Sequence, residues 1–305
     1  MDNNGLSAVN GGTVMEQAKT EAARAAAEAP LFSFQVITDT HVTEDAEHTH
    51  NRNFDNALQQ IKALAPQSKG IMHVGDVTDH GFPNEFAQFW RIWESHRSEL
   101  PEMIMTTGNH DVGLGVWEDR IGRFLFSTGT PGPYHAHDIE GHRFIFLGTE
   151  KNLKIHCSLS QEQLRWLKNK LEEKAASGRP IFIFLHQPLK NTVAGSYEEQ
   201  QWHGVEEDEE LRAVLAGYPQ AILFTGHTHW ELEAGHTYYD GDGQLPAMVN
   251  AVSTAYLWTD EDQHKDGSQG LFVDVYENRV LVRGRDFANA AWVESARYEI
   301  LYPRG

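Results

Sequence analysis

The chain has 305 residues, of which 44 are Asp or Glu and 25 are Lys or Arg, so its formal net charge is −19. Hydrophobic residues make up 40% and aromatic residues 10% of it, which excludes a largely disordered protein. So acidic a protein repels long nucleic acids, and no apolar run approaches the roughly 20 residues of a membrane helix. A single cysteine, Cys157, excludes an internal disulfide and a multi-cysteine metal site.

Residues 1–29 differ in composition from the rest of the chain. They are polar and then rich in Ala and Glu up to Pro30. We expect a flexible or helical leader over 1–29, followed by a single domain over 30–305. The leader lacks the basic and apolar regions of a secretory signal, which favours a cytoplasmic protein. A secreted protein is the alternative if a signal is missing from this chain.

Strand and helix patterns alternate between residues 32 and 225. Short apolar runs predict strands at 32–37, 71–74, 103–107, 181–185 and 221–225. Helical spacing predicts helices at 53–65, 84–96 and 206–215, and another that begins at the capping box of Ser160 and Gln163. A hairpin is predicted over 134–148, with its turn at Glu140-Gly141.

After residue 230 the pattern changes to strands without helices, predicted at 231–239, 248–257, 271–276, 280–285 and 293–300. The alternating part predicts a largely parallel buried sheet, and the late strands predict a second sheet packed on it. The fold class is therefore α/β, with two packed mixed β-sheets flanked by helices.

Each of the five early strands is followed by Asp, Asn or His, which are residue types that commonly bind metal ions. The segments that follow them are Asp39-Thr40-His41, Gly75-Asp76, Gly108-Asn109-His110-Asp111, His186 and Gly226-His227-Thr228-His229. Ligands of open α/β sheets bind beyond the carboxyl ends of strands, so these side chains are expected to lie together. Two carboxylates, four imidazoles and an amide oxygen suit Mn, Fe, Co or Zn better than Mg or Ca. Seven ligands are too many for one ion but suit two ions that share a carboxylate.

The order of these five blocks resembles the calcineurin-like metallophosphoesterase superfamily. Its pattern is Asp-x-His, Gly-Asp-x-x-Asp/Asn, Gly-Asn-His-Asp/Glu, a lone His and Gly-His-x-His, and all five blocks occur here. Their spacing is most similar to the bacterial branch of cyclic-nucleotide and glycerophosphodiester phosphodiesterases. The resemblance implies a four-layer α/β/β/α sandwich and a hydrolase with two metal ions per chain.

Site roles follow from the resemblance residue by residue. It implies that Asp39, His41, Asp76 and His229 hold the first ion, and that Asp76, Asn109, His186 and His227 hold the second. His110 matches the non-ligand histidine beside the scissile phosphate, and Asp111 is expected to orient its ring. Protein Ser/Thr phosphatases carry Asp-Arg-Gly where this chain has Asp79-His80-Gly81, so a phosphoprotein substrate is disfavoured.

The implied mechanism is in-line attack on phosphorus by a hydroxide that bridges the two ions. His110 then donates a proton to the leaving oxygen or stabilises its charge. A site charge of roughly +1 suits a small phosphodiester. A phosphomonoesterase or a nucleotide pyrophosphatase is the alternative, and a non-catalytic scaffold is disfavoured because no ligand of the pattern is missing. His80 and Trp230 are candidate substrate contacts, although packing between sheets is the alternative for Trp230. The segment 188–204 is either a rim of the site or a surface loop.

Overall fold

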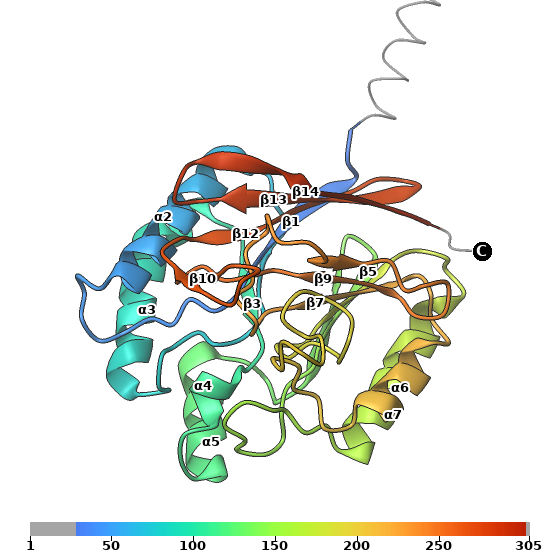
Figure 1. Cartoon of the computed structure of the whole chain (residues 1–305), viewed down its shortest axis with the longest axis horizontal. Helices are drawn as coiled ribbons and strands as arrows, with labels where there is room; N and C mark the ends of the chain where they lie inside the picture. Colours follow the sequence, from blue (N-terminus) through green and yellow to red (C-terminus); the bar gives the residue numbers. More distant parts are fainter. Residues whose placement is uncertain (1–28, 303–305) are drawn as a thin grey trace, which may run out of the picture.

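The computed structural model describes residues 29–302, so the expected leader at 1–29 lies, except for its last residue, outside the described residues. Two six-stranded mixed sheets lie against each other, and helices cover their outer faces (Figure 1). This arrangement confirms the predicted fold class.

The first sheet has the strand order β14-β13-β12-β1-β2-β3. Its strands are β1 (Phe32–Ile37), β2 (Ile71–His73), β3 (Met103–Met105), β12 (Gln269–Val275), β13 (Arg279–Asp286) and β14 (Ala291–Leu301). Strands β1, β2 and β3 are parallel, whereas β12 runs antiparallel to β1 and pairs with it from Phe32↔Val275 to Val36↔Leu271. Strands β12, β13 and β14 therefore extend the first sheet, whereas the other late strands and two of the early strands belong to the second sheet. The expectation of one early sheet and one late sheet is wrong, because each sheet combines early and late strands. Pairing with β12 gives hydrogen-bond partners to the edge of β1 that β2 leaves free.

The second sheet has the order β4-β5-β6-β7-β9-β8. Its strands are β4 (His135–Ile139), β5 (His142–Phe146), β6 (Ile181–Phe184), β7 (Ala221–Thr225), β8 (Tyr238–Tyr239) and β9 (Ala247–Asn250). The predicted hairpin is β4–β5, and its turn residues Glu140 and Gly141 have φ values of 49° and 78°. Left-handed backbone at both positions is typical of the tight turns that match the twist of a hairpin. The predicted strand 231–239 is reduced to β8, and 248–257 is interrupted after Asn250.

Helices α2 (Thr49–Leu64), α3 (Pro83–His96) and α5 (Trp117–Thr128) pack on the first sheet, and α6 (Gln161–Ala175) and α7 (Asp208–Leu215) on the second. The short elements are η1 (Arg97–Glu99), α4 (Asn109–Val112) and the hairpin of β10 (Leu257–Trp258) and β11 (His264–Lys265). Ser160 caps α6 by accepting a hydrogen bond from the Gln163 N–H, as predicted. Helix α5 was not predicted.

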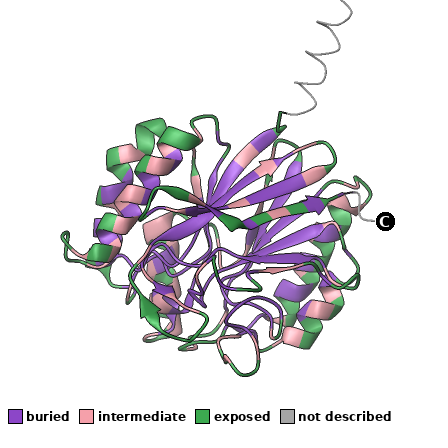
Figure 2. Cartoon of the chain, turned by 45° about the horizontal axis from the view of Figure 1, so that its top comes forward, coloured by how far each residue is buried: buried purple, intermediate pink, exposed green. Residues whose placement is uncertain are grey.

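Three hydrophobic clusters hold the layers together. The central cluster lies between the sheets, where Phe34 of β1 packs edge-on against Phe144 and Phe182, with ring centroids 5.1 and 4.9 Å away. The other two join each sheet to its helices. Figure 2 shows the result, since most strands are buried while the helices are exposed on their outer sides. The layers are therefore helix, sheet, sheet and helix.

Candidate metal centre

The carboxyl ends of β1, β2 and β3 adjoin those of β6 and β7 from the other sheet. The residues that follow these five strands are the seven predicted ligands, and all of their side chains are buried: Asp39, His41, Asp76, Asn109, His186, His227 and His229. Side chains from the two sheets contact each other here, because Asp39 Oδ1 lies 2.9 Å from His229 Nε2. The site therefore lies at the junction of two sheets and not along the edge of one.

The backbone at the site is unusual. Five of the seven residues have left-handed φ values: Asp39 (51°), His41 (40°), Asp76 (50°), His227 (70°) and His229 (58°). Non-glycine residues seldom adopt this conformation, and it is typical of functional sites that the surrounding structure holds in place. The backbone is also closely packed at Gly108, since a Cβ at this position would lie 2.1 Å from Asp76 Oδ1.

The described residues contain four groups of possible ligands, and two of them consist entirely of predicted ligands. The other two share Asp79, with His41 and His110 in one and His80 and Glu85 in the other. In the first group of predicted ligands, Asp39, His41 and His229 place one ligand atom each within 4.8 Å of one another. His41 Nε2 lies 3.2 Å from His229 Nε2 and 3.6 Å from Asp39 Oδ1. In the second group, Asp76, His186 and His227 satisfy the same criterion.

Asp76 lies between the two groups. Its Oδ2 atom is 3.2 Å from His186 Nε2 in its own group and 3.7 Å from His41 Nε2 in the other. A carboxylate in this position can reach two cations at once.

The histidine rings are held so that one nitrogen faces the site. His186 Nδ1 donates a hydrogen bond to the Val74 carbonyl (2.7 Å) and His229 Nδ1 to the Tyr256 carbonyl (3.1 Å). Such contacts fix the other ring nitrogen toward a metal ion. Within residues 29–302, the buried Nε2 atom of His227 has no hydrogen-bond partner, and that of His186 faces only the carboxylates of Asp76 (3.2 Å) and Asp39 (3.8 Å). Because buried polar atoms seldom lack a partner, these atoms fit metal ligands.

The electrostatics of the site favour positive charge. Burial raises the pKa of Asp76, but the charges of His186 and His110 outweigh burial and hold this pKa well below its usual range. Burial lowers the pKa of His186, but the charges of Asp76 and Asp39 outweigh it and raise this pKa to about 9. The buried carboxylates are thus anionic and hold positive charge beside them, which is the condition for binding a cation.

Asn109 approaches the site with its amide oriented. Its Nδ2 donates to the Lys154 carbonyl (2.9 Å), and its Oδ1 accepts from Gln187 Nε2 (3.3 Å). Because the amide nitrogen bonds to Lys154, the amide oxygen, which is the better metal ligand of the two atoms, points away from that carbonyl. Gln187 was not predicted, although its position directly after His186 was the available signal.

His110 lies at the mouth of the site. Its Nδ1 donates a hydrogen bond to the Asp79 carbonyl (2.7 Å), and its ring centroid is 4.5 Å from that of His41. Its backbone N–H donates to Asp76 Oδ1 (2.8 Å). About a third of the side chain is exposed, so the ring can meet a substrate.

Asp111 is placed differently from the expectation. Its carboxylate accepts hydrogen bonds from the backbone N–H groups of Val77, Thr78 and Gly108 at 3.2, 3.0 and 3.0 Å. Among the described residues it makes no hydrogen bond to the His110 ring, which Asp79 orients instead. Asp111 is the third residue of α4, where a carboxylate turns back to the free N–H groups at the helix start. It thereby ties the loop that carries Asp76 to α4.

His80 lies at the rim of the site. Its Nδ1 is 3.1 Å from Asp79 Oδ2 and 3.2 Å from Glu85 Oε1, and about half of its side chain is exposed. Its ring is stacked on that of Phe82 at a centroid distance of 5.6 Å. His80 is therefore accessible, and its contact with substrate stays a prediction.

Trp230 is fully buried, in a cluster with Ala194 and Ala234. A side chain without exposed surface does not meet a substrate in this structure. Trp230 therefore has a packing role, although in this small cluster and not between the sheets as expected. Trp202 is the tryptophan near the site, with its ring centroid 5.8 Å from that of His227. Because Trp202 belongs to the segment 188–204, this segment borders the centre. Of its two interpretations, a rim of the site or a surface loop, the structure favours the rim.

Tyr256 is a further neighbour that was not predicted. Its ring centroid lies 4.3 Å from that of His229 and 5.7 Å from that of His41. It lies after β9 in the segment 248–257, whose apolar pattern predicts a continuous strand and gives no sign of a site residue.

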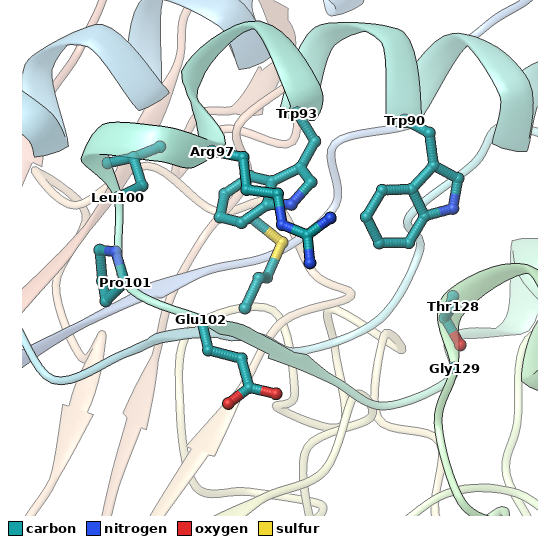
Figure 3. A pocket seen from close by; sticks show the side chains of 9 residues that line it. Trp90, Trp93, Arg97, Leu100, Pro101, Glu102, Thr128 and Gly129 are labelled. Carbon is teal, nitrogen blue, oxygen red and sulfur yellow. The ribbon is translucent and has the colours of Figure 1, made fainter.

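A separate pocket of about 490 Å³ is lined by Trp90, Trp93, Arg97 and Glu102, among others (Figure 3). It also contacts Met103, the first residue of β3. Since the candidate ligands follow the last residues of their strands, this pocket lies at the other end of β3.

The sequence of this chain is similar to those of known proteins. Residues 32–231, which include all seven candidate ligands, match the family model described as calcineurin-like phosphoesterase. The chain belongs to this family. It is 25% identical to a probable cyclic nucleotide phosphodiesterase of Rhodococcus erythropolis over 80% of each chain. It is 23% identical to a probable glycerophosphodiester phosphodiesterase of Arcobacter nitrofigilis, covering 63% of this chain and 70% of that one.

Among solved structures, a dimetal phosphatase from Danio rerio superposes with a TM-score of 0.65 at 15% identity. The match covers 90% of this chain and 99% of that one, which shows a common fold. The predicted resemblance to the family is confirmed. As a calcineurin-like phosphoesterase, this protein is a phosphoester hydrolase. Between residues 29 and 302, each helix is too short or too polar to cross a membrane. The single domain and the cytoplasmic location stay predictions.

Proposed function

We propose that this hydrolase cleaves small phosphodiesters at a centre of two metal ions. In this proposal Asp39, His41, Asp76 and His229 hold one ion, and Asp76, Asn109, His186 and His227 hold the other. The observation that carries it is the position of Asp76 Oδ2, 3.2 and 3.7 Å from one histidine of each group. The mixed oxygen and nitrogen donors suit Mn, Fe, Co or Zn. When bound, two such ions supply an activated water and positive charge opposite the phosphoryl oxygens.

His110 is proposed to give a proton to the leaving oxygen. Because its Nδ1–H is engaged by the Asp79 carbonyl, Nε2 carries a proton only in the doubly protonated ring. A carboxylate oxygen, Asp79 Oδ1, lies 4.0 Å from the same nitrogen of His110. Donation from Nε2 then leaves a neutral ring that keeps its bond to Asp79.

The charges around the site support a diester substrate. Two divalent ions outweigh the two carboxylates among the predicted ligands, so the centre attracts an ester anion. The basic side chains nearest in sequence are engaged elsewhere, since Lys190 Nζ lies 3.3 Å from Glu198 Oε1 and Arg52 bonds to the Glu47 carbonyl and Thr49. Asp79 adds a negative charge at the rim. A monoester dianion would meet more repulsion here than a diester monoanion does.

The names of the two relatives support the same conclusion, because both describe enzymes that act on phosphodiesters. The test compares kcat/KM for a cyclic nucleotide, a glycerophosphodiester, a dinucleotide pyrophosphate and nitrophenyl phosphate under one metal condition. We expect a natural diester to be the best substrate. If the monoester or the pyrophosphate exceeds every natural diester by tenfold, about 1.4 kcal/mol in barrier, the diester assignment is wrong.

A further inference from the structure

Three aromatic rings form a row beside the candidate metal centre. The ring centroids of His50 and Tyr256 are 5.5 Å apart with planes at 27°, and those of Tyr256 and His264 are 5.3 Å apart at 30°. His264 is exposed, and the other two residues are half-buried. Tyr256 therefore lies between the two histidine rings, and the row reaches solvent at its His264 end.

Two rings of the row lie beside predicted metal ligands. The ring of Tyr256 lies 4.3 Å from that of His229, and the ring of His50 lies 6.2 Å from that of His41. The Tyr256 carbonyl accepts the hydrogen bond of His229 Nδ1 at 3.1 Å. The distance between the row and the centre is therefore set by both backbone and ring contacts.

Three separate parts of the chain hold these rings. His50 is in the first turn of α2, where its Nδ1 donates to the His41 carbonyl (3.1 Å). Tyr256 directly precedes β10, and His264 is in β11, opposite Trp258. The Trp258 N–H donates to the His229 carbonyl at 2.9 Å, which fixes this hairpin against the site. Tyr256 belongs to none of the hydrophobic clusters of the described residues, so packing of the core does not account for its position.

The geometry points to a stacking surface, formed by His50, Tyr256 and His264, for a flat heteroaromatic ring carried by the ester, such as the base of a nucleotide. Aromatic side chains bind bases through their π faces, whichever base is present. A glycerol ester has no such ring and gains nothing from this surface. The inference rests on the proposed function and adds to it the chemical class of one ester substituent.

The test uses two esters that differ only in the ring. These are adenosine 3′,5′-cyclic phosphate and the methyl riboside 3′,5′-cyclic phosphate, which has no base. We expect the native enzyme to prefer the first in kcat/KM by about 5- to 100-fold, the range of base stacking on aromatic side chains. Tyr256→Leu and His264→Leu should each lower this ratio at least threefold, and Tyr256→Phe should keep it. Because the ratio is taken within one variant, a general loss of activity cancels.

Tyr276→Leu is the matched control, since Tyr276 follows the last residue of β12 and lies near the first residue of β1, away from the centre. It should leave the ratio unchanged. A native ratio near 1, or a ratio that Tyr256→Leu and His264→Leu both preserve, overturns the inference.

A binding measurement separates this inference from the proposed function. The dissociation constants of adenosine monophosphate and ribose 5-phosphate are measured by calorimetry on the metal-loaded protein. If neither the cyclic esters nor a glycerophosphodiester is hydrolysed, the proposed function fails, and tighter binding of adenosine monophosphate that Tyr256→Leu removes still supports the stacking surface. Equal binding of the two ligands contradicts it.

Discussion

The His110→Ala variant tests the proposed acid without disturbing the metal ions. The contact between His110 and Asp76 Oδ1 is made by the backbone N–H, at 2.8 Å, and survives the substitution. The side chain contributes its bond to the Asp79 carbonyl, its packing on His41 and its charge near Asp79 and Asp76, but it is not one of the seven predicted ligands. We therefore expect the metal content of the variant to match that of the native protein.

The expected loss depends on the leaving group. A positioned acid contributes about 10²–10⁴ to the rate, which corresponds to about 2.7–5.4 kcal/mol in barrier. An alkyl diester such as a glycerophosphodiester has a basic leaving oxygen and should lose this full factor. Bis-nitrophenyl phosphate releases a stable phenolate that needs little protonation and should lose less than about tenfold.

The assay is kcat/KM for both esters, with metal content measured on the same preparations. His96→Ala is a matched control, because His96 pairs with Asp55 (2.7 Å) at the end of α3 and takes no part in the site. Its values should equal those of the native enzyme. Equal losses for both leaving groups in His110→Ala, or a fall in its metal content, would refute the assignment of His110 as an acid.

Three further variants or probes test the surroundings. Asp39→Ala should retain about one ion per chain, because Asp39 belongs to only one ligand group; loss of both ions would show that the groups are not separate. Gly108→Ala should lower both metal content and stability, the latter by about 1–3 kcal/mol in urea unfolding, since a Cβ would lie 2.1 Å from Asp76 Oδ1; a native midpoint would contradict this crowding. Burial, with the charges of Glu207 and Glu206, raises the pKa of the Cys157 thiol, so a thiol reagent should modify it slowly in the native protein and rapidly in denaturant. Because the unfolded thiol ionises at lower pH than the folded one, Cys157 should lower the free energy of unfolding as the pH rises through the ordinary thiol range, and Cys157→Ala should remove that slope.

Strands with strong local patterns could be predicted from the sequence. The predicted bounds of β1 and β7 coincide with those observed, because continuous apolar runs end there at residues that turn the backbone. The pairing of β12 with β1 could not be predicted, since it joins segments more than 230 residues apart. Helix α5 was missed because Gly122 and polar residues interrupt its apolar pattern, although Phe124 is fully buried against the first sheet.

The candidate ligands were predicted because each follows a strand in a short block with few alternatives. The surroundings could not be predicted in the same way. Tyr256 and Gln187 reach the site through the tertiary path of loops, and Trp230 turns into the protein although it directly follows His229. Asp111 is next to His110 in sequence, but its carboxylate bonds to the start of its own short helix. Neighbours in sequence therefore differ in which way their side chains face.

The most direct test of the central claim is the number of metal ions bound per chain in native protein and in Asp76→Ala. Both are loaded with the same metal, freed of excess ions and measured by atomic spectrometry, with Asp138→Ala as a matched control, because Asp138 pairs with Arg143 on β4–β5. If Asp76 joins two ions, the native protein and the control should hold about two ions, and Asp76→Ala well below one. An Asp76→Ala variant that keeps two ions, or one at full occupancy, would contradict a centre built on this carboxylate.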